Sequence, residues 1–196
     1  MSKETDTQEP ELPSSFKTRL YKIKHSEGQS EQNKFRSIRK RFGEVAGWGE
    51  IDFAQIESDG STDLDVMTWD KESLWLPVSR RGAGAEQLLV IIAEVLMRGA
   101  RVVGIEELES NLDEFNQKRL YDLLETLVGN GFGHVGQIVA TAHSYFYSHE
   151  LDNHEKLFVE KGANGRTKVK PWSTAAHDAL FKPGDYRGER RRRRSR

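Results

Sequence analysis

Two short apolar runs, each preceded by a helical pattern, constrain the fold of this chain more than any other feature. Arg101–Ile105 follows an apolar helix predicted over Glu86–Met97, and Val135–Thr141 follows an amphipathic helix predicted over Asp113–Val128. Apolar runs of this kind are typical of strands buried on both faces, and strands that alternate with helices form parallel sheets. The sequence therefore predicts an α/β sheet, whose ligands would bind at the carboxyl ends of its strands.

Other patterns predict helices and a small β-rich segment beside this sheet. The expected elements are a helix at Lys34–Phe42, strands at 50–56, 63–68 and 74–78, and a hairpin at 156–161 and 166–170. Asp59-Gly60 is a hairpin turn signal between the first two of these strands. The apolar face of the 113–128 helix is expected to contain Phe115, Leu120, Leu123, Leu124 and Leu127.

The two ends of the chain are more polar than its middle. Residues 1–33 are rich in Ser, Glu, Gln and Lys, so we expect them to be disordered or linker, with at most a short helix turn near Phe16 and Leu20. The core domain is then 34–176. Residues 177–196 form a disordered basic tail that includes Arg190, Arg191, Arg192, Arg193 and Arg194. This tail is either a nucleic-acid-binding segment or a solvated run of charge.

Charge and cysteine content exclude several classes of protein. The 30 Lys and Arg residues nearly cancel the 31 Asp and Glu residues, so the net charge of −1 gives no global argument for nucleic acid or membrane. No cysteine is present, which excludes a disulfide framework, a thiolate zinc site and a cysteine nucleophile. The longest apolar run, Leu88–Ala93, is too short for a bilayer, and no apolar stretch follows Met1. We expect a cytoplasmic protein that contacts no membrane.

Polar residues follow both apolar runs directly. Glu106 and Glu107 follow the first run, and a Mg²⁺ ion would relieve the repulsion between their adjacent carboxylates while one of them orients or deprotonates a water. His143 follows the second run and would lie near Glu107 if the strands pair, where a neutral imidazole could contact a phosphate or position water. The alternative is two solvated acids and an ordinary loop histidine.

A glycine-rich segment precedes the first helix of this region. Gly82-Ala83-Gly84 leads into Glu86–Met97, and small residues at a helix amino terminus let a backbone approach an anion closely. A lone Gly-x-Gly is a weak signal and is equally consistent with a tight turn.

Taken in order, these motifs resemble the carboxyl half of ABC-type AAA ATPases, over about residues 35–150. The motifs are Gly-Ala-Gly-Ala-Glu-Gln-Leu-Leu, Val-Val-Gly-Ile-Glu-Glu-Leu-Glu-Ser-Asn-Leu and Gln-Ile-Val-Ala-Thr-Ala-His-Ser. The most similar branch is the overcoming-lysogenization-defect and DNA-repair or SMC-like group. The resemblance implies a partial P-loop NTPase sheet, ATP and Mg²⁺ as cofactors, and either a homodimer or a partner ATPase chain.

The resemblance also implies a role for individual residues. Gly82, Ala83, Gly84 and Gln87 match the ABC signature, which faces the nucleotide of the other protomer. Glu106 matches the metal-associated Walker B acid, and Glu107 matches the catalytic glutamate that polarises water. Asn111 and Asp113 match the D-loop at the dimer interface, and His143 matches the switch histidine that senses the terminal phosphate.

The sequence departs from the family at several positions. Glu106 replaces the usual Asp, Leu108 the usual Pro, and Gly82 the signature Ser. The phosphate-binding Walker A pattern, Gly-x-x-x-x-Gly-Lys-Ser/Thr, is absent from these residues. We therefore expect weak or no ATP hydrolysis by the chain alone, and a need for a Walker A half from elsewhere.

Two alternatives to an ATPase half remain open. One is a non-catalytic regulatory or interaction module that docks a complete ATPase and touches DNA through its Arg tail. The other is a gene fragment with no separate role. In each case an exposed sheet edge would make the isolated chain a poor monomer.

Overall fold

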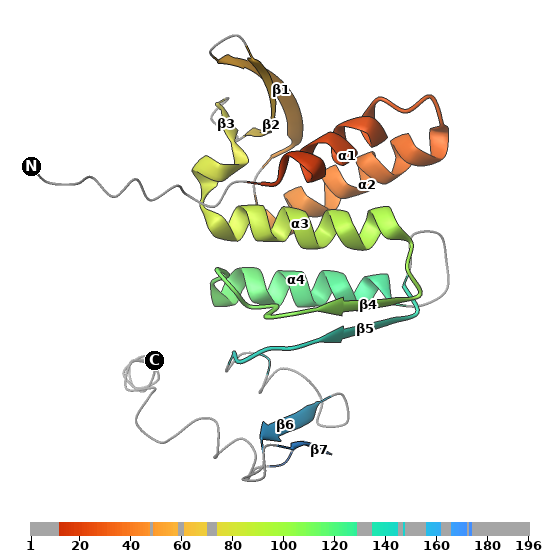
Figure 1. The fold of residues 1–196 in the computed structure, drawn as a ribbon, viewed down its shortest axis with the longest axis vertical. Coiled ribbons are helices and arrows are strands. Elements are labelled where there is room, and N and C mark those ends of the chain that lie inside the picture. The colour runs from red at the N-terminus through yellow and green to blue at the C-terminus, as the bar shows by residue number, and fades with distance from the viewer. Residues whose placement is uncertain are drawn as a thin grey trace, which may run out of the picture. The chain divides into compact units, whose positions relative to one another are not determined.

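The computed structural model describes residues 12–47, 49–58, 61–69, 74–128, 135–144, 147, 156–161, 166–171 and 173, arranged as in Figure 1. Its helical elements are α1 (Ser14–Lys24), α2 (Gln29–Ala46), the 3₁₀ turn η1 (Val78–Arg81), α3 (Ala83–Arg98) and α4 (Glu114–Leu127). Its strands are β1 (Ile51–Ser58), β2 (Ser61–Trp69), β3 (Trp75–Pro77), β4 (Val102–Ile105), β5 (Gln137–Ala140), β6 (Leu157–Lys161) and β7 (Thr167–Pro171). The chain divides into two compact units, residues 1–142 and 143–196.

Helices α1 and α2 correct the expectation of a disordered or linker segment for residues 14–33, and residues 1–11 lie outside the described residues. Phe16 and Leu20, four residues apart in α1, are both buried, and α1 packs against α2. The buried Lys17 ammonium lies 3.2 Å from the Asp65 carboxylate of β2, which joins α1 to the neighbouring sheet. The charged and polar neighbours of Phe16 and Leu20 concealed this short apolar stripe in the sequence.

Three helices form the core of the first unit. α2 contacts both α3 and α4, and it begins five residues before and ends four residues after the range predicted from sequence. α3 ends at Arg98, and Gly99 after it closes the helix with a left-handed φ of 56°. Phe115 is a correction, because it is 63% exposed rather than part of the apolar face of α4. Among the described helices, none is long and apolar enough to cross a membrane.

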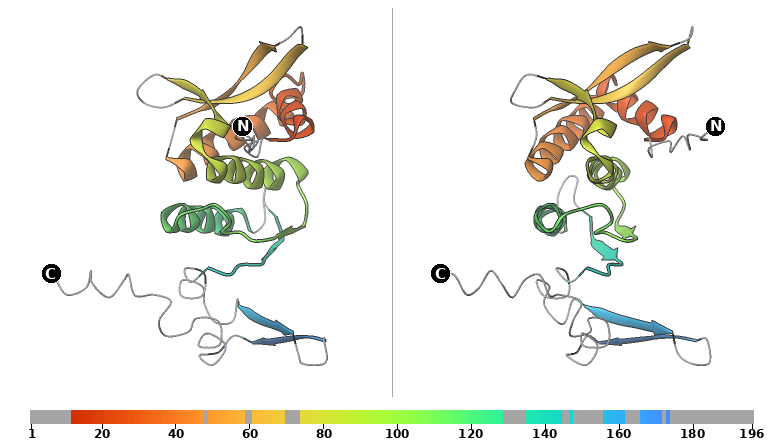
Figure 2. Two further views of the ribbon diagram at one scale, coloured as in Figure 1. Left: turned by 60° about the vertical axis from the view of Figure 1, so that its left-hand side comes forward. Right: turned by 90° about the vertical axis from the view of Figure 1, so that its left-hand side faces the viewer.

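The predicted β-rich segment is an antiparallel sheet in the order β1-β2-β3. Its register pairs Phe53 with Val66 and Thr68 with Leu76. Figure 2 shows the β1–β2 pair curving over α1 and α2, and contacts between α1 and β2 and between α2 and β1 hold it there. The predicted turn at Asp59-Gly60 lies outside the described residues.

Strands β4 and β5 pair in parallel, as predicted, with Val103 opposite Ile138 and Ile105 opposite Ala140. Their expected burial on both faces is not found, because Val102 is 59% and Val139 is 54% exposed. Within the described residues this sheet has two strands, whereas parallel sheets normally have both faces covered.

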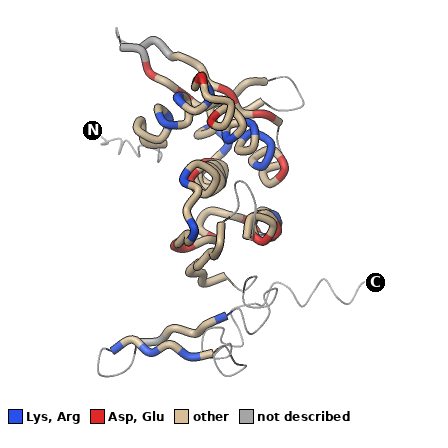
Figure 3. Tube along the Cα trace, turned by 90° about the vertical axis from the view of Figure 1, so that its right-hand side faces the viewer, with Lys and Arg blue, Asp and Glu red and all other residues tan. Residues whose placement is uncertain are grey.

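The second unit contains the predicted hairpin, β6 paired antiparallel with β7. Val159 lies opposite Val169, and both are exposed. Figure 3 shows Lys and Arg residues along this hairpin. The β7 sequence contains Lys168 and Lys170. The Arg190–Arg194 run lies outside the described residues. The expected core domain over 34–176 stays a prediction, and it spans both compact units.

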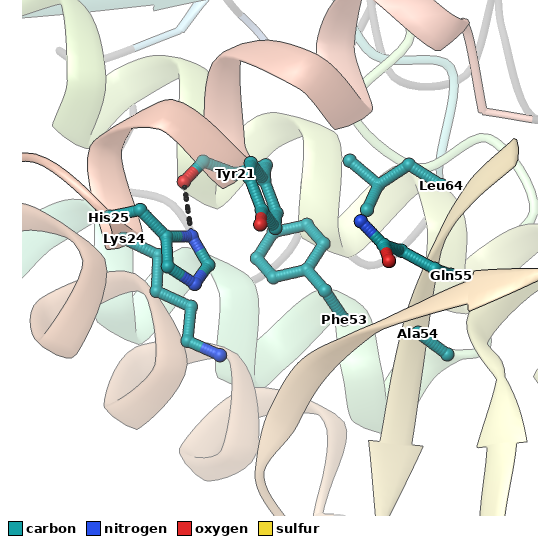
Figure 4. A pocket seen from close by; sticks show the side chains of 7 residues that line it. All are labelled: Tyr21, Lys24, His25, Phe53, Ala54, Gln55 and Leu64. Carbon is teal, nitrogen blue, oxygen red and sulfur yellow. Dashed lines mark hydrogen bonds between the residues drawn. The ribbon is translucent and has the colours of Figure 1, made fainter. Parts of the chain in front are cut away.

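A surface cavity of about 290 Å³ lies where α1 meets β1 and β2 (Figure 4). The Tyr21 and Phe53 rings meet edge to face, with centroids 5.4 Å apart. The Lys24 ammonium lies 5.6 Å from the Phe53 ring centroid and is paired with the Asp52 carboxylate. The charged group that lines this cavity is thus already neutralised by its own chain.

The Asp52 carboxylate is held in its ionised form by this contact. Partial burial raises the pKa of Asp52, but the Lys24 hydrogen bond, the Phe53 backbone N–H and the nearby cations lower it more, so the net pKa lies below the ordinary 3.8. A lowered pKa in the folded state stabilises the fold above the ordinary value, and this contribution is lost as pH falls through the folded-state value.

We expect Asp52→Asn to lower the melting temperature near neutral pH, and to lower it progressively less as the pH is taken below about 4. Thermal unfolding followed by circular dichroism between pH 7 and pH 2.5 measures this. Asp122→Asn is the matched control, since Asp122 and Lys118 form a pair at 3.7 Å in which both side chains are 56% exposed. A constant difference between Asp52→Asn and wild type over this range would contradict the assignment.

Candidate functional site

The carboxyl ends of β4 and β5 are joined by backbone hydrogen bonds that continue beyond the strands. The Thr141 N–H donates to the Ile105 carbonyl at 2.9 Å, and the Leu108 N–H donates to the Thr141 carbonyl at 3.0 Å. These bonds place the turn after β4, residues 106–112, against the end of β5. We call this segment the acidic turn, because it begins with the two predicted site acids.

The acidic turn reverses direction at Glu107, whose φ of 48° is left-handed. This conformation is uncommon for a residue other than glycine, asparagine or aspartate, and such residues cluster at functional sites. Glu106 and Glu107 are both exposed. The Ser110 hydroxyl donates to the Glu107 carboxylate at 3.0 Å, and the Glu107 N–H donates to the Thr141 hydroxyl at 3.0 Å.

The remainder of the acidic turn leads into α4. Asn111 is also left-handed, with φ of 58°, which asparagine tolerates well. The side chains of Leu108 and Leu112 are buried and anchor the turn. Asp113 caps α4, because its two carboxylate oxygens accept from the Asn116 backbone N–H and side-chain amide, each at 2.9 Å.

The glycine-rich segment at the start of α3 packs directly on the acidic turn. Gly82 caps α3 with φ of 94°, a conformation that favours glycine, and Ala83 is the first helical residue. A Cβ at Gly84 would lie 2.4 Å from the Asn111 carbonyl oxygen. The backbones of α3 and the acidic turn therefore approach as closely as they do only because residue 84 has no side chain.

Gln87, one turn further along α3, connects two residues of the acidic turn. Its amide nitrogen donates to the Glu107 carbonyl at 3.3 Å, and its amide oxygen accepts from the Asn111 side chain at 3.1 Å. The structure thus brings together four residues predicted from separate motifs: Gly84, Gln87, Glu107 and Asn111. We call these four residues the motif junction.

Glu106 and Glu107 are the residues of this region that could hold a metal ion. Across the described ranges, no group of three or more His, Asp or Glu residues is arranged to hold a metal ion. Mg²⁺ often binds through one or two carboxylates together with substrate phosphates and water. The exposed carboxylates of Glu106 and Glu107 at the end of β4 fit that mode.

His143 follows β5 and is the first residue of the second unit. Its side chain is exposed. Its predicted position near Glu107 depends on how the two units are arranged and stays a prediction. Thr141, by contrast, makes two hydrogen bonds to the acidic turn and one to Ile105 at the end of β4, and it was missed by the sequence reasoning. The one sequence signal for Thr141 was its hydroxyl at the end of the second apolar run.

No protein-family model matches the sequence, and no curated protein matches it. Solved structures do match. One is an SMC ATPase studied for ATP-driven dimerization and DNA-stimulated activation, at 15% identity and a TM-score of 0.58 over 85% of this chain and 92% of that chain. Another is an Smc head bound to the C-winged helix domain of ScpA, at 16% identity and a TM-score of 0.54 over 87% of this chain and 54% of that chain.

A third is the Smc head domain with a coiled coil and joint from Pyrococcus yayanosii, at 16% identity and a TM-score of 0.53. It is matched over 78% of this chain and 31% of that chain, so this chain spans about a third of its length. These similarities confirm the predicted fold class: the chain has a mixed α/β fold like that of SMC ATPase head domains, which are P-loop NTPases of the ABC type.

The close approach at Gly84 predicts a specific sensitivity to a single methyl group. Gly84→Ala should lower the free energy of unfolding by about 1–3 kcal/mol, because overpacking forces the acidic turn away from α3. Chemical denaturation monitored by tryptophan fluorescence measures this. Gly104→Ala in β4 is the control, since a Cβ there meets nothing within 4 Å. Equal stability of the two variants would show that the contact does not constrain the turn.

Proposed function

We propose that this chain is the carboxyl half of an ABC-type ATPase domain, which binds and hydrolyses ATP with Mg²⁺ once a Walker A half is supplied from elsewhere. The observation that carries the proposal is the motif junction. The residues that resemble the signature lie 20 or more positions before those that resemble the catalytic glutamate and the D-loop, yet Gly84 approaches Asn111 and Gln87 bonds to Glu107 and Asn111.

The exposure of the β4–β5 sheet supports the proposed requirement for a Walker A half. Parallel strands are almost always covered on both faces, whereas Val102 of β4 and Val139 of β5 are more than half exposed. A segment that pairs strands with the edges of this sheet and packs helices on its exposed face would bury these side chains, and it could carry the missing phosphate-binding loop.

Each site residue has a proposed role in this reaction. Glu107 polarises the attacking water, and Glu106 associates with the Mg²⁺ ion that the nucleotide phosphates bring. Gly82, Ala83 and Gly84 at the amino terminus of α3 face the phosphates of a nucleotide bound to another protomer, where the helix dipole favours anions. His143 senses the terminal phosphate. Transfer of a phosphoryl group to water needs mainly such positioning and charge stabilisation.

The similar solved structures suggest which partners this chain could have. One similar structure concerns ATP-driven dimerization and DNA-stimulated activation of SMC ATPases, and another is a head bound to part of ScpA. We propose a homodimer or a partner ATPase chain, with Asn111 and Asp113 at the interface. The Arg190–Arg194 run would contact nucleic acid backbones, in keeping with a DNA-repair or phage-defence role.

Reconstitution tests the ATPase proposal. The open reading frame upstream in the source genome is read for Gly-x-x-x-x-Gly-Lys-Ser/Thr, and its product is co-expressed with this chain. We expect the isolated chain to release little phosphate from Mg²⁺-ATP, and the pair to hydrolyse ATP at ordinary rates. Glu107→Gln should reduce the rate of the pair by about 100-fold or more, because it removes the water-polarising carboxylate.

Glu114→Gln, an exposed acid in the first turn of α4, is the matched control and should leave the rate unchanged. Hydrolysis by the isolated chain that Glu107→Gln abolishes would refute the requirement for a second half. A pair that assembles but never binds or hydrolyses ATP would favour the non-catalytic docking module instead.

The exposed faces of β4 and β5 predict self-association of the isolated chain. Light scattering after gel filtration should show oligomers or aggregates, and the double variant Val102→Thr, Val139→Thr should raise the monomer fraction while keeping β-branched side chains. The corresponding change Val159→Thr, Val169→Thr in the second unit is the control. A stable monodisperse wild-type monomer would contradict the prediction.

A further inference from the structure

We propose that Thr141 is a positioning residue whose hydroxyl holds Glu107 in its left-handed conformation and so sets the direction of the Glu107 carboxylate. The catalytic consequence rests on the proposed ATPase function, but the positioning itself does not. Thr141 lies on the segment that follows β5, whereas Glu107 follows β4, and 34 residues separate them in sequence.

Thr141 contacts the end of β4 and the acidic turn through three of its own groups. Its backbone N–H donates to the Ile105 carbonyl and its carbonyl accepts from the Leu108 N–H, so these two bonds bracket the turn. Its hydroxyl accepts from the Glu107 N–H at 3.0 Å, between the two bracketing bonds. The two backbone bonds fix the chain at Ile105 and at Leu108, and the hydroxyl bond fixes Glu107 between them.

The Glu107 N–H needs such an acceptor because its direction depends on φ. With φ at 48°, the peptide group before Glu107 is rotated away from the direction it would have in an extended strand. A hydroxyl acceptor at the end of β5 favours this rotated state over the alternatives. Loss of the hydroxyl would let the peptide turn back, and the side chain would then leave its Ser110 contact.

The Glu107 carbonyl is bound by the acidic turn itself and by α3. Its carbonyl accepts from the Ser110 N–H at 2.9 Å and from the Gln87 amide at 3.3 Å. The Thr141 hydroxyl bond adds a contact from β5. The orientation of Glu107 is therefore coupled to the pairing of β4 with β5, which is the part of the sheet that a second half would complete.

Three variants separate the hydroxyl from the rest of the residue. Thr141→Val keeps the branched shape and both backbone bonds but removes the acceptor, and Thr141→Ser restores a hydroxyl. Thr126→Val is the matched control, since the Thr126 hydroxyl donates to the Leu123 carbonyl at 2.7 Å on α4, away from the acidic turn.

Amide hydrogen exchange and NOE spectra of the full chain provide the direct readout. In Thr141→Val, exchange of the Glu107 amide should accelerate by about two- to tenfold, and the strong intraresidue Hα–HN contact of a left-handed residue should weaken. The Leu108 and Thr141 amides should keep their protection, and Thr141→Ser and Thr126→Val should resemble wild type at Glu107. Unchanged Glu107 signals in Thr141→Val would overturn the proposal.

The ATPase assembly supplies the second readout. If Glu107 acts on water, Thr141→Val should lower kcat with little change in KM, and Thr141→Ser should restore it. A normal kcat together with altered Glu107 signals would overturn the catalytic part of the proposal. If wild type and Glu107→Gln are equally inactive, the proposed function fails, and the exchange data alone decide whether Thr141 positions Glu107.

Discussion

The parallel pairing of β4 with β5 is the constraint on which the rest of the site depends. Because the pairing continues past the strands through Thr141, the acidic turn is fixed at the point where it leaves the sheet. α3 can then approach the turn at Gly84, and Gln87 can reach both Glu107 and Asn111. A shift of one residue in this pairing would move the Glu107 N–H away from its acceptor and separate the motifs.

The same two strands are also the least completed part of the first unit. The helices α2, α3 and α4 bury a continuous apolar core, whereas Val102 and Val139 face outward from the sheet. Two exposed valines leave stabilisation unused, since full burial of each side chain contributes about 1.5–3 kcal/mol. The ordered site and the uncovered sheet together favour a chain that is completed by another segment.

The sequence predicted the elements whose apolar pattern is strong and local. The strands at 102–105 and 137–140, with α3 and α4 before them, followed from apolar runs and helical spacing. Residues 14–33 were mistaken for linker because the buried Phe16 and Leu20 stand among charged neighbours. Phe115 was placed in the core because its spacing fits the apolar face, but its ring is 63% exposed and lies under the Arg119 guanidinium, 4.1 Å from the ring centroid.

The residues of the candidate site were also predictable from local motifs, whereas the contacts between them were not. Glu107, Gln87 and Asn111 were recognised by motif, but their mutual contacts depend on the close approach at Gly84, which no local pattern encodes. The role of Thr141 depends on the register between two strands joined by a long connection, so it could be found only in three dimensions.

Two left-handed residues within the acidic turn have a further physical implication. Backbone conformations of this kind cost free energy and persist only when the surroundings determine them more than once. At Glu107 the restraints come from α3 through Gln87, from the turn itself through Ser110, and from β5 through Thr141. A displacement of any of the three elements would therefore alter the same carboxylate. Under the proposed function, completion of the sheet beside β5 and engagement of the α3 amino terminus would both act on the Glu107 carboxylate.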